Sequence, residues 1–475
     1  MNPIRIFRNI LCAAAALTAV GVSLTSCIED DVTLSPADQP VFSADTLDVG
    51  RIFMDEPSQT HAIKAYNHSD KVMRISRIGF QSGSEGCFRI NVDGFSGKDF
   101  RDVDIRPNDS IFILVSATVP RVLSASSVED KLEFETNGVT RSVVLKATGV
   151  DAVTLTDPVI DSDTRWDAEK PVRIYGELTV APGVSLTLGE GLTVYMHDKA
   201  SIEVHGSLRS EGTADAPVVI RGDRSGTVIT GITFDLMSRQ WAGMTIHPDA
   251  SPCELCFTEI RNTEYGVFVD GPTATDVPQL TLIGCRLRNS RDNVLAAYHT
   301  SVRAVSTEFA ESGASPVWVI GGEALFDHCT FSNYYLFSAI TGPLLQVSHC
   351  TDDNLDAEQP GLPRAKVRVT NSVLYGMSAD MSPTSLDGTD VYVHRCLLRS
   401  PGSDDEHFTD IIWGGNPLFR TQREEYYFDY RLGADSPALG ASDPATTAVD
   451  LPVTDFYGAV RPAQPAIGAY EIFTE

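Results

Sequence analysis

The chain has 475 residues and a formal net charge of −27, with 37 basic and 64 acidic side chains. This charge opposes binding to nucleic acid or to an anionic membrane surface, and it disfavours broad capture of acidic polysaccharides, although a local basic groove is still compatible with that role. Beyond the N-terminal segment no apolar run is long enough to cross a bilayer, and the length indicates two or three domains or one long solenoid.

Residues 1–27 combine a basic leader, containing Arg5 and Arg8, with an apolar stretch too short for a comfortable membrane span. This pattern predicts a secretory signal. Its end, LTSC, resembles the bacterial lipoprotein signal, which implies that Cys27 is acylated and becomes the mature N-terminus. The alternative is an ordinary signal peptide with a chance cysteine. The acidic run IEDDV that follows resembles a surface-export signal of Gram-negative lipoproteins, which implies a lipid anchor in the outer membrane and display towards the cell exterior.

Residues 28–39 are polar, lack periodicity and are predicted to form a tether. From 40 to 149, seven short alternating segments are separated by turn residues, which is typical of an immunoglobulin-like β-sandwich. This region resembles the Ig-like modules that often follow a lipoprotein anchor. It shows no nucleophile–base pairing or metal-ligand spacing, so we expect a spacer.

Residues 151–475 open with very short alternating strands that have glycines between them or at their ends. Such frequent corners, without any helical period, predict a β-solenoid. The segment GTADAPVVIRG, together with its neighbours, resembles the N-terminal coil of secreted right-handed parallel β-helix proteins. The predicted fold is therefore all-β, with an Ig-like sandwich followed by a right-handed parallel β-helix.

A triplet on alternate positions, small residue–apolar residue–polar residue, recurs in this region at steps of about 22 residues, which is typical of one β-helix coil. We expect the first column to be compact filler and the middle column to be core. The third should be a corner column whose amides bond the next coil and the turn backbone. The first column is Thr258, Cys285, Thr307, Cys329 and Cys350; the polar column includes Asn262, Asn289, Asn333 and Asn354. The rung Cys350–Asn354 is expected directly above Cys329–Asn333, and its middle residue, Asp352, stands where an apolar side chain is expected.

The outward positions of the same strands carry charges. Glu259, Arg286 and Glu308 alternate in sign and predict a surface ion-pair ladder of small energetic value. Arg261 and Arg288 would stack, and two stacked arginines without a carboxylate between them could hold an anionic sugar group. The alternative is two solvated arginines on a curved face.

The C-terminal segment 416–471 contains NPLFR, DYRLGADSPALGAS and DFYGAVRPAQPAIGAYE. These motifs resemble the terminal segment of bacterial β-helix proteins of the choice-of-anchor Q type, and the resemblance extends over residues 155 to 471. It implies fold and secretion, not a defined activity. We expect the segment to cap the last hydrophobic layer of the solenoid.

Evidence for chemistry is sparse. CELC at 253–256 lacks the strand-to-helix context of a redox motif and a second ligand pair for zinc, so a structural role is expected. His328 and His349 precede cysteines of adjacent coils and should stack on the outer face. No cofactor is predicted, and calcium has no specific support. Five aromatic residues are candidates for sugar stacking, although each is equally suited to core or cap packing: Tyr334, Tyr335, Trp413, Tyr426 and Tyr427.

Three functions share this architecture. The preferred hypothesis is a surface-anchored lipoprotein that binds an extracellular glycan or another ligand without catalysis. The second is a polysaccharide lyase or glycoside hydrolase, although no carboxylate is clearly paired with a base. The third is a structural or adhesive surface element. Nucleic acid is excluded as a partner on charge.

Overall fold

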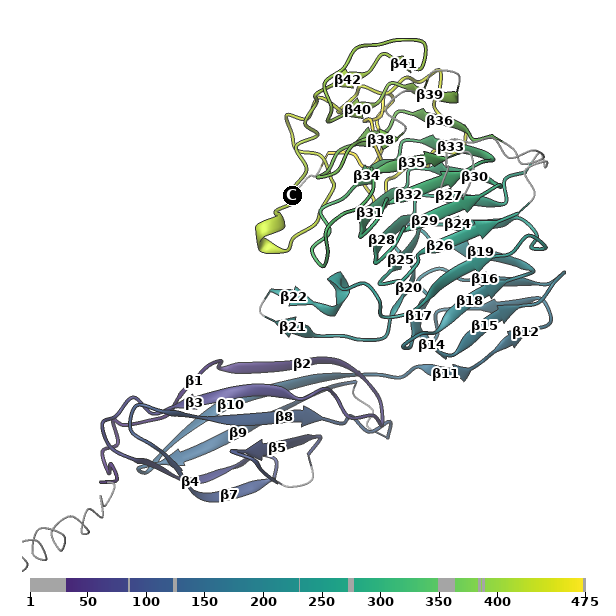
Figure 1. Cartoon of the computed structure of the whole chain (residues 1–475). Coiled ribbons are helices and arrows are strands. Elements are labelled where there is room, and N and C mark those ends of the chain that lie inside the picture. The colour runs from purple at the N-terminus through teal and green to yellow at the C-terminus, as the bar shows by residue number, and fades with distance from the viewer. Residues whose placement is uncertain are drawn as a thin grey trace, which may run out of the picture. The chain divides into compact units, whose positions relative to one another are not determined.

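The computed structural model describes residues 31–83, 86–122, 126–229, 231–271, 277–348, 364–382, 386 and 389–472. The chain divides into two compact units, with the boundary between Gly149 and Val150. Both units are built from strands (Figure 1). This confirms the predicted all-β class with an Ig-like sandwich followed by a right-handed parallel β-helix. Within the described residues no helix is long and apolar enough to cross a membrane.

The first unit is a sandwich of two antiparallel sheets. One sheet has the order β1 (Val41–Phe42), β3 (His61–Tyr66), β8 (Ser110–Ala117), β5 (Phe88–Val92) and β6 (Phe95–Gly97). The other has the order β2 (Thr46–Phe53), β10 (Val139–Val150), β9 (Ser127–Thr136), β4 (Met73–Phe80) and β7 (Asp99–Ile105). Inward side chains such as Ile63, Ile113 and Phe134 are completely buried, because alternate residues of each strand face the partner sheet.

The second unit is a solenoid with three parallel sheets, I, II and III, which the chain visits in this order from Val153 to His394. Sheet I contains β11 (Val153–Thr156), β14 (Val172–Tyr175), β17 (Thr193–Met196), β20 (Val218–Gly222), β25 (Thr258–Arg261), β28 (Arg286–Ser290), β31 (Glu308–Ser312), β34 (Thr330–Ser332), β37 (Val373–Leu374), β40 (Leu397–Leu398) and β42 (Ile412–Trp413). Sheet II contains β12 (Val159–Ile160), β15 (Glu177–Val180), β18 (Ser201–Val204), β23 (Gly243–Ile246), β26 (Val267–Asp270), β29 (Leu295–Tyr298), β32 (Val317–Ile320), β35 (Leu345–Ser348) and β38 (Met381–Ser382). Sheet III contains β13 (Thr164–Trp166), β16 (Ser185–Leu188), β19 (Ser207–Glu211), β24 (Cys253–Cys256), β27 (Leu280–Ile283), β30 (Ser301–Val305), β33 (Glu323–Asp327), β36 (Lys366–Thr370), β39 (Asp390–His394) and β41 (Phe408–Thr409).

Two further elements of this unit lie outside the coils. A short antiparallel hairpin is formed by β21 (Thr227–Ile229) and β22 (Ile232–Thr233), followed by a 3-10 turn, η1 (Phe234–Leu236). A second 3-10 turn, η2 (Arg423–Glu425), lies in the C-terminal segment.

The solenoid core is a continuous stack of apolar side chains. Along sheet I, Ile260 is the register partner of Leu287, Leu287 of Phe309, and Phe309 of Phe331. The rings of Phe309 and Phe331 stack with centroids 5.3 Å apart. Parallel stacking of identical coils therefore places one apolar residue per coil on the same axis, as the middle column of the repeat predicts.

The prediction that the rung Cys350–Asn354 lies directly above the rung Cys329–Asn333 was wrong. β34 pairs with β37, so that Thr330 is opposite Val373 and Phe331 is opposite Leu374. Cys350, Asp352 and Asn354 lie outside the described residues. The sequence pattern failed here because the segment between the two rungs is longer than one coil step.

The expected role of the C-terminal segment was also wrong. Residues 416–472 do not close the end of the solenoid but run along the outward face of sheet I, where the yellow-green chain lies beside β31, β34 and β40 in Figure 1. Ile467 and Leu432 pack there on Val373 and Leu397, and Tyr430 and Tyr470 pack on Ala310. Phe408, Ile411 and Trp413, near the end of the solenoid in sequence, pack on its core.

Candidate functional site

Arg261 and Arg288, the predicted anion ligands, are stacked as register partners on β25 and β28. Both guanidinium groups are nevertheless paired with other groups of the protein. Arg261 lies 3.1 Å from Glu259 and 3.6 Å from Asp235, and Arg288 lies 3.6 Å from Glu308 and donates to the Phe428 carbonyl at 3.4 Å. The side chain of Arg288 is only 8% exposed. The pair is therefore part of a covered ion-pair network and not an open anion site.

The charges between these arginines form the alternating ladder that the sequence predicts, but the ladder is buried and not on the surface. Arg286 lies 3.2 Å from Glu259 and 3.6 Å from Glu308. Burial raises the pKa of Glu259, but the positive charges of Arg286 and Arg261 outweigh that effect and lower its pKa to about 2. The C-terminal segment covers the ladder, and the hydroxyl of Tyr470 donates to Glu308 at 2.5 Å. This network stabilises the C-terminal segment on sheet I and leaves little access for a ligand.

An accessible groove lies at the corner between sheets I and II. It encloses a cavity of about 440 Å³. Two insertions form most of its walls: the described residues of 223–242, between β20 and β23, and residues 333–344, between β34 and β35. The lining residues are Asp198, Arg224, Phe234, Met237, Ser238, Arg239, Gln240, Arg291, Tyr335, Phe337 and Ser338.

The groove is rich in arginine although the chain is strongly acidic. Arg224, Arg239 and Arg291 line it, and Asp198 is the one carboxylate among the lining residues that the structure describes. Arg239 and Arg291 share Glu264 at 3.7 and 3.3 Å, yet their side chains remain 60% and 50% exposed. Three arginines against the carboxylates of Asp198 and Glu264 leave a net positive charge at the cavity, which favours an anionic ligand.

Aromatic side chains complete the walls of the groove. The Arg224 guanidinium group lies 5.8 Å from the centre of the Phe234 ring. Phe337 is 38% exposed, and the Tyr335 ring contacts it edge-on with centroids 5.6 Å apart. The Tyr335 hydroxyl is 2.5 Å from that of Ser238, so a bond between the two insertions fixes this ring. Phe234 and Tyr335 are buried, at 8% and 4% exposure, so Phe337 is the exposed ring of this group, and such a ring beside polar donors is suited to the mixed apolar and hydroxyl surface of a sugar.

Two asparagines of the repeat hold one wall of the groove, the turn η1. Asn262 donates to the carbonyls of Asp235 and Met237 at 2.9 and 2.8 Å, and Asn289 donates to the Leu236 carbonyl at 2.9 Å. Both asparagines adopt the left-handed conformation, with φ of 70° and 57°, which asparagine tolerates better than most residues. Asn333 donates to the Ser312 carbonyl of the adjacent coil. The corner column therefore binds backbone carbonyls, whereas the sequence pattern predicts bonds from amide to amide as well.

Tyr335, one of the aromatic candidates predicted from the sequence, lies at the groove but is only 4% exposed, and the three groove arginines were not predicted. Arg224, Arg239 and Arg291 are scattered over almost 70 positions and belong to no repeated pattern, so only the coiling of the chain brings them together. The sequence did hold one signal for Arg224 and Arg239: the long interval between β20 and β23, which indicates an insertion. Of the other aromatic candidates, Trp413 packs on the core and Tyr334 stacks on Tyr430. Tyr426 follows η2, and Tyr427 is 42% exposed and donates to Asp429.

The cysteine and histidine motifs have structural surroundings. Cys253 is buried and Cys256 half-buried in the strand β24, far from any strand-to-helix turn. Cys285 and Cys329 are buried in the core. His328 is fully buried beside Asp327, so the prediction that it stacks on the outer face was wrong, and His349 lies outside the described residues. Among the residues that the structure describes, no group of three or more His, Cys, Asp or Glu could hold a metal ion.

Comparison of the sequence with protein families and with curated proteins gives no match. The solved structures that are similar, at low scores, include three glycoside hydrolases. A family 123 glycoside hydrolase from Clostridium perfringens, studied for glycolipid glycan hydrolysis, is 8% identical over 27% of this chain and 30% of that one, with a TM-score of 0.18. The catalytic unit of a GH87 α-1,3-glucanase from Streptomyces thermodiastaticus is 10% identical over 75% of this chain and 77% of that one, with a TM-score of 0.26. A GH87 α-1,3-glucanase catalytic domain in complex with tetrasaccharides is 10% identical over 74% and 87%, with a TM-score of 0.21. The chain spans less than a third of the first of these proteins.

Proposed function

We propose that this protein is a non-catalytic binder of an extracellular glycan and that the groove between sheets I and II holds an acidic sugar of that glycan. One observation carries the proposal: Arg224, Arg239 and Arg291 line a cavity of about 440 Å³ together with aromatic rings, on a chain whose net charge is −27. A planar guanidinium group binds a carboxylate or a sulfate through two parallel hydrogen bonds. The ring of Phe337, which is 38% exposed, supplies stacking surface for the sugar.

Catalysis at this groove is the weaker hypothesis. A glycoside hydrolase needs two carboxyl groups that flank the scissile bond, whereas Asp198 is the one carboxylate among the described lining residues. A lyase needs a base that is deprotonated near neutral pH, and Tyr335 is the nearest candidate. Burial raises the pKa of Tyr335, however, despite the lowering effect of Arg291 and Arg239, and so disfavours that role.

The test is binding of a panel of acidic polysaccharides to the soluble protein, measured by calorimetry. Replacing Arg239 and Arg291 together with alanine should weaken binding at least tenfold, because both bidentate contacts are lost. Arg165→Ala is the matched control, since this half-exposed solenoid arginine pairs with Asp167 and Glu211 outside the groove. Equal loss in the control, or no binding by the wild-type protein, would contradict the proposal. Release of unsaturated products or of reducing ends would establish the enzyme hypothesis.

We also propose that Cys27 carries a lipid that anchors the protein to the outer membrane, facing the cell exterior. The support is the LTSC sequence and the acidic run that follows it. Cells that express the full chain should incorporate radioactive palmitate into the protein, and Cys27→Ser should abolish incorporation. Degradation by protease added to intact cells would support outward display, whereas protection would favour the periplasmic side.

A further inference from the structure

The outward face of sheet II carries aromatic side chains on three successive coils. Phe268 on β26, Tyr298 on β29 and Trp318 on β32 are all partly exposed. The rings of Phe268 and Tyr298 stack with centroids 6.4 Å apart and planes 27° apart. Ala296 is the register partner of both Phe268 and Trp318, so a small residue separates these two rings along their column. The result is a broken aromatic stripe along the axis of the solenoid.

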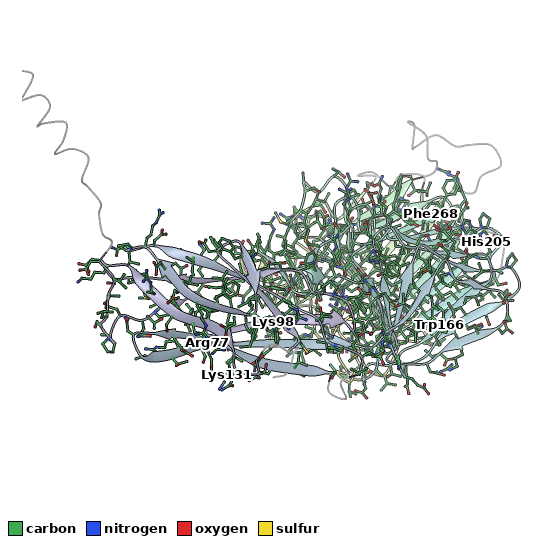
Figure 2. The ribbon with its side chains drawn as sticks, turned by 90° about the horizontal axis from the view of Figure 1, so that it is seen from below. Arg77, Lys98, Lys131, Trp166, His205 and Phe268 are labelled. Atoms are coloured by element: carbon green, nitrogen blue, oxygen red, sulfur yellow. The ribbon has the colours of Figure 1, made fainter. Side chains whose placement is uncertain are left out.

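This face has a different charge from the groove. None of the described strands of sheet II contains lysine or arginine, whereas sheet III carries Arg209, Arg303 and Arg368. The polar groups around the stripe are carboxylates, hydroxyls and imidazoles. His205 and His247 stack with ring centroids 4.0 Å apart, and each lies 2.9 Å from a carboxylate, Asp249 and Glu203 respectively. Figure 2 shows His205 and Phe268 on the same flank of the molecule.

The stripe is continuous with the arginine groove. Glu264, the carboxylate that Arg239 and Arg291 share, is adjacent in the chain to Tyr265. The Tyr265 hydroxyl lies 3.4 Å from that of Thr245, whose register partner is Phe268. The rim of the groove therefore leads directly onto the outward face of sheet II.

We infer that the stripe of Phe268, Tyr298 and Trp318 is a second binding surface for the same glycan chain and that it accepts uncharged sugars. The inference rests on the proposed function of the groove. Stacked coils repeat at about 4.8 Å, which is comparable to the length of one sugar unit, so a polymer along the axis would meet a new coil at each residue. Aromatic rings stack on the apolar faces of sugars, and the carboxylate–imidazole pairs offer hydrogen bonds to hydroxyl groups.

The charge difference between the two surfaces specifies the class of ligand. The groove attracts an anion, whereas Glu203 and Asp270 on sheet II would repel one. A polymer with an acid on every sugar would suit the groove but not the stripe. The ligand class that satisfies both is a long polysaccharide in which acidic and uncharged sugars alternate.

The experiment compares polymers of different charge spacing on the full-length soluble protein. Hyaluronan and chondroitin, in which uronic acids alternate with uncharged N-acetylhexosamines, are the mixed probes. Polygalacturonate and alginate, which carry a carboxylate on every sugar, are the fully charged probes. We expect the protein to bind at least one mixed polymer more tightly than either fully charged one, and to bind its long fragments more tightly than its tetrasaccharide.

The double variant Phe268→Ala/Tyr298→Ala should bind the long mixed polymer about tenfold more weakly and the tetrasaccharide unchanged, because only the long chain reaches the stripe. Tyr392→Ala, which removes a partly exposed aromatic ring from the outward face of sheet III, is the matched control. Tight binding of the fully charged polymers with no effect of the double variant would overturn the inference and leave the proposed function intact. Failure of all acidic polymers to bind would overturn both.

Discussion

The Glu311 carboxyl group lies at the edge of the buried ladder, where it accepts a hydrogen bond from Tyr430. Burial raises its pKa to about 7, while the Tyr430 bond and the charge of Arg288 act in the opposite direction. A glutamate in the unfolded chain titrates near pH 4.3. As the pH rises between these values, the unfolded chain loses its proton while the folded protein keeps it, so the folded state is progressively destabilised.

We predict that Glu311→Gln removes this pH dependence, because the amide stays neutral and still accepts from Tyr430. The wild-type solenoid should lose on the order of 3 kcal/mol of unfolding free energy between about pH 4.5 and pH 7 through this group alone, and the variant should lose correspondingly less. Chemical denaturation at a series of pH values measures the difference. Glu323→Gln, at an exposed carboxylate paired with Lys366, is the control and should follow the wild-type profile. Parallel profiles for wild type and Glu311→Gln would refute the prediction.

The core cysteines lead to a prediction about reactivity. Burial raises the pKa of the Cys285 and Cys396 thiols to about 12 and that of Cys256 to about 11. Only the thiolate reacts with alkylating agents. Iodoacetamide at pH 8 should therefore leave Cys285, Cys329 and Cys396 unmodified in the native protein and modify them after unfolding, with half-buried Cys87 reacting first. Peptide mass spectrometry reads each site separately. Rapid native modification of Cys329 would show that this column is not packed as described.

At the scale of elements, the C-terminal segment is fixed on sheet I by a buried polar contact. Arg461 pairs with Glu471 at 2.8 Å, and the two side chains are 3% and 5% exposed. The same guanidinium group donates to the Ser306 hydroxyl at 2.7 Å and to the Ala469 carbonyl at 2.8 Å. One side chain thus connects the segment both to itself and to the corner before β31.

Replacing Arg461 with methionine should destabilise the solenoid by about 3–5 kcal/mol, because Glu471 would be left as an unpaired buried charge. The double variant Arg461→Met/Glu471→Gln should recover much of this loss, since the neutral amide still accepts from the Ala466 N–H. Urea denaturation of the wild type and of the single and double variants measures the coupling. If the double variant is as unstable as Arg461→Met, the loss comes from the contacts to Ser306 and Ala469 and not from the charge.

The C-terminal segment also shows which part of the fold could not be predicted from the sequence. Alternation and frequent corners were enough to predict the solenoid, because every coil repeats the same local rule for which side chains point inward. The position of the C-terminal segment depends on contacts between residues more than 100 positions apart, such as Tyr470 with Glu308, and no local pattern encodes these. β7 was missed because its sequence, DFRDVDI, carries charges on a strand that is largely solvent-facing. The groove arginines were missed for a related reason: Arg224 and Arg239 lie in an insertion that interrupts the repeat, and Arg291 lies in the corner between β28 and β29, outside the repeated triplet.

At the scale of the whole molecule, two separate cores imply two separate folding units. Phe134 is fully buried in the first unit, where its ring lies 4.5 Å from that of Phe42, and Phe331 is fully buried in the solenoid between Phe309 and Phe326. The two hydrophobic clusters that contain them share no residue. A cavity in one core should therefore leave the stability of the other core unchanged.

We predict that Phe134→Ala lowers the unfolding free energy of the Ig-like unit by about 3–5 kcal/mol and leaves the solenoid unaffected, and that Phe331→Ala does the reverse. Hydrogen exchange with peptide resolution, followed across a denaturant series, reports the stability of each unit in the same sample. Lost protection should remain within Val41–Val150 for the first variant. For the second it should remain within the solenoid, and it should be greatest in the coils next to β34, because each coil of a solenoid contacts only its neighbours. Equal loss in both units from either substitution would mean that the chain unfolds as one cooperative body, in which case neither unit acts as an independent spacer or binding module.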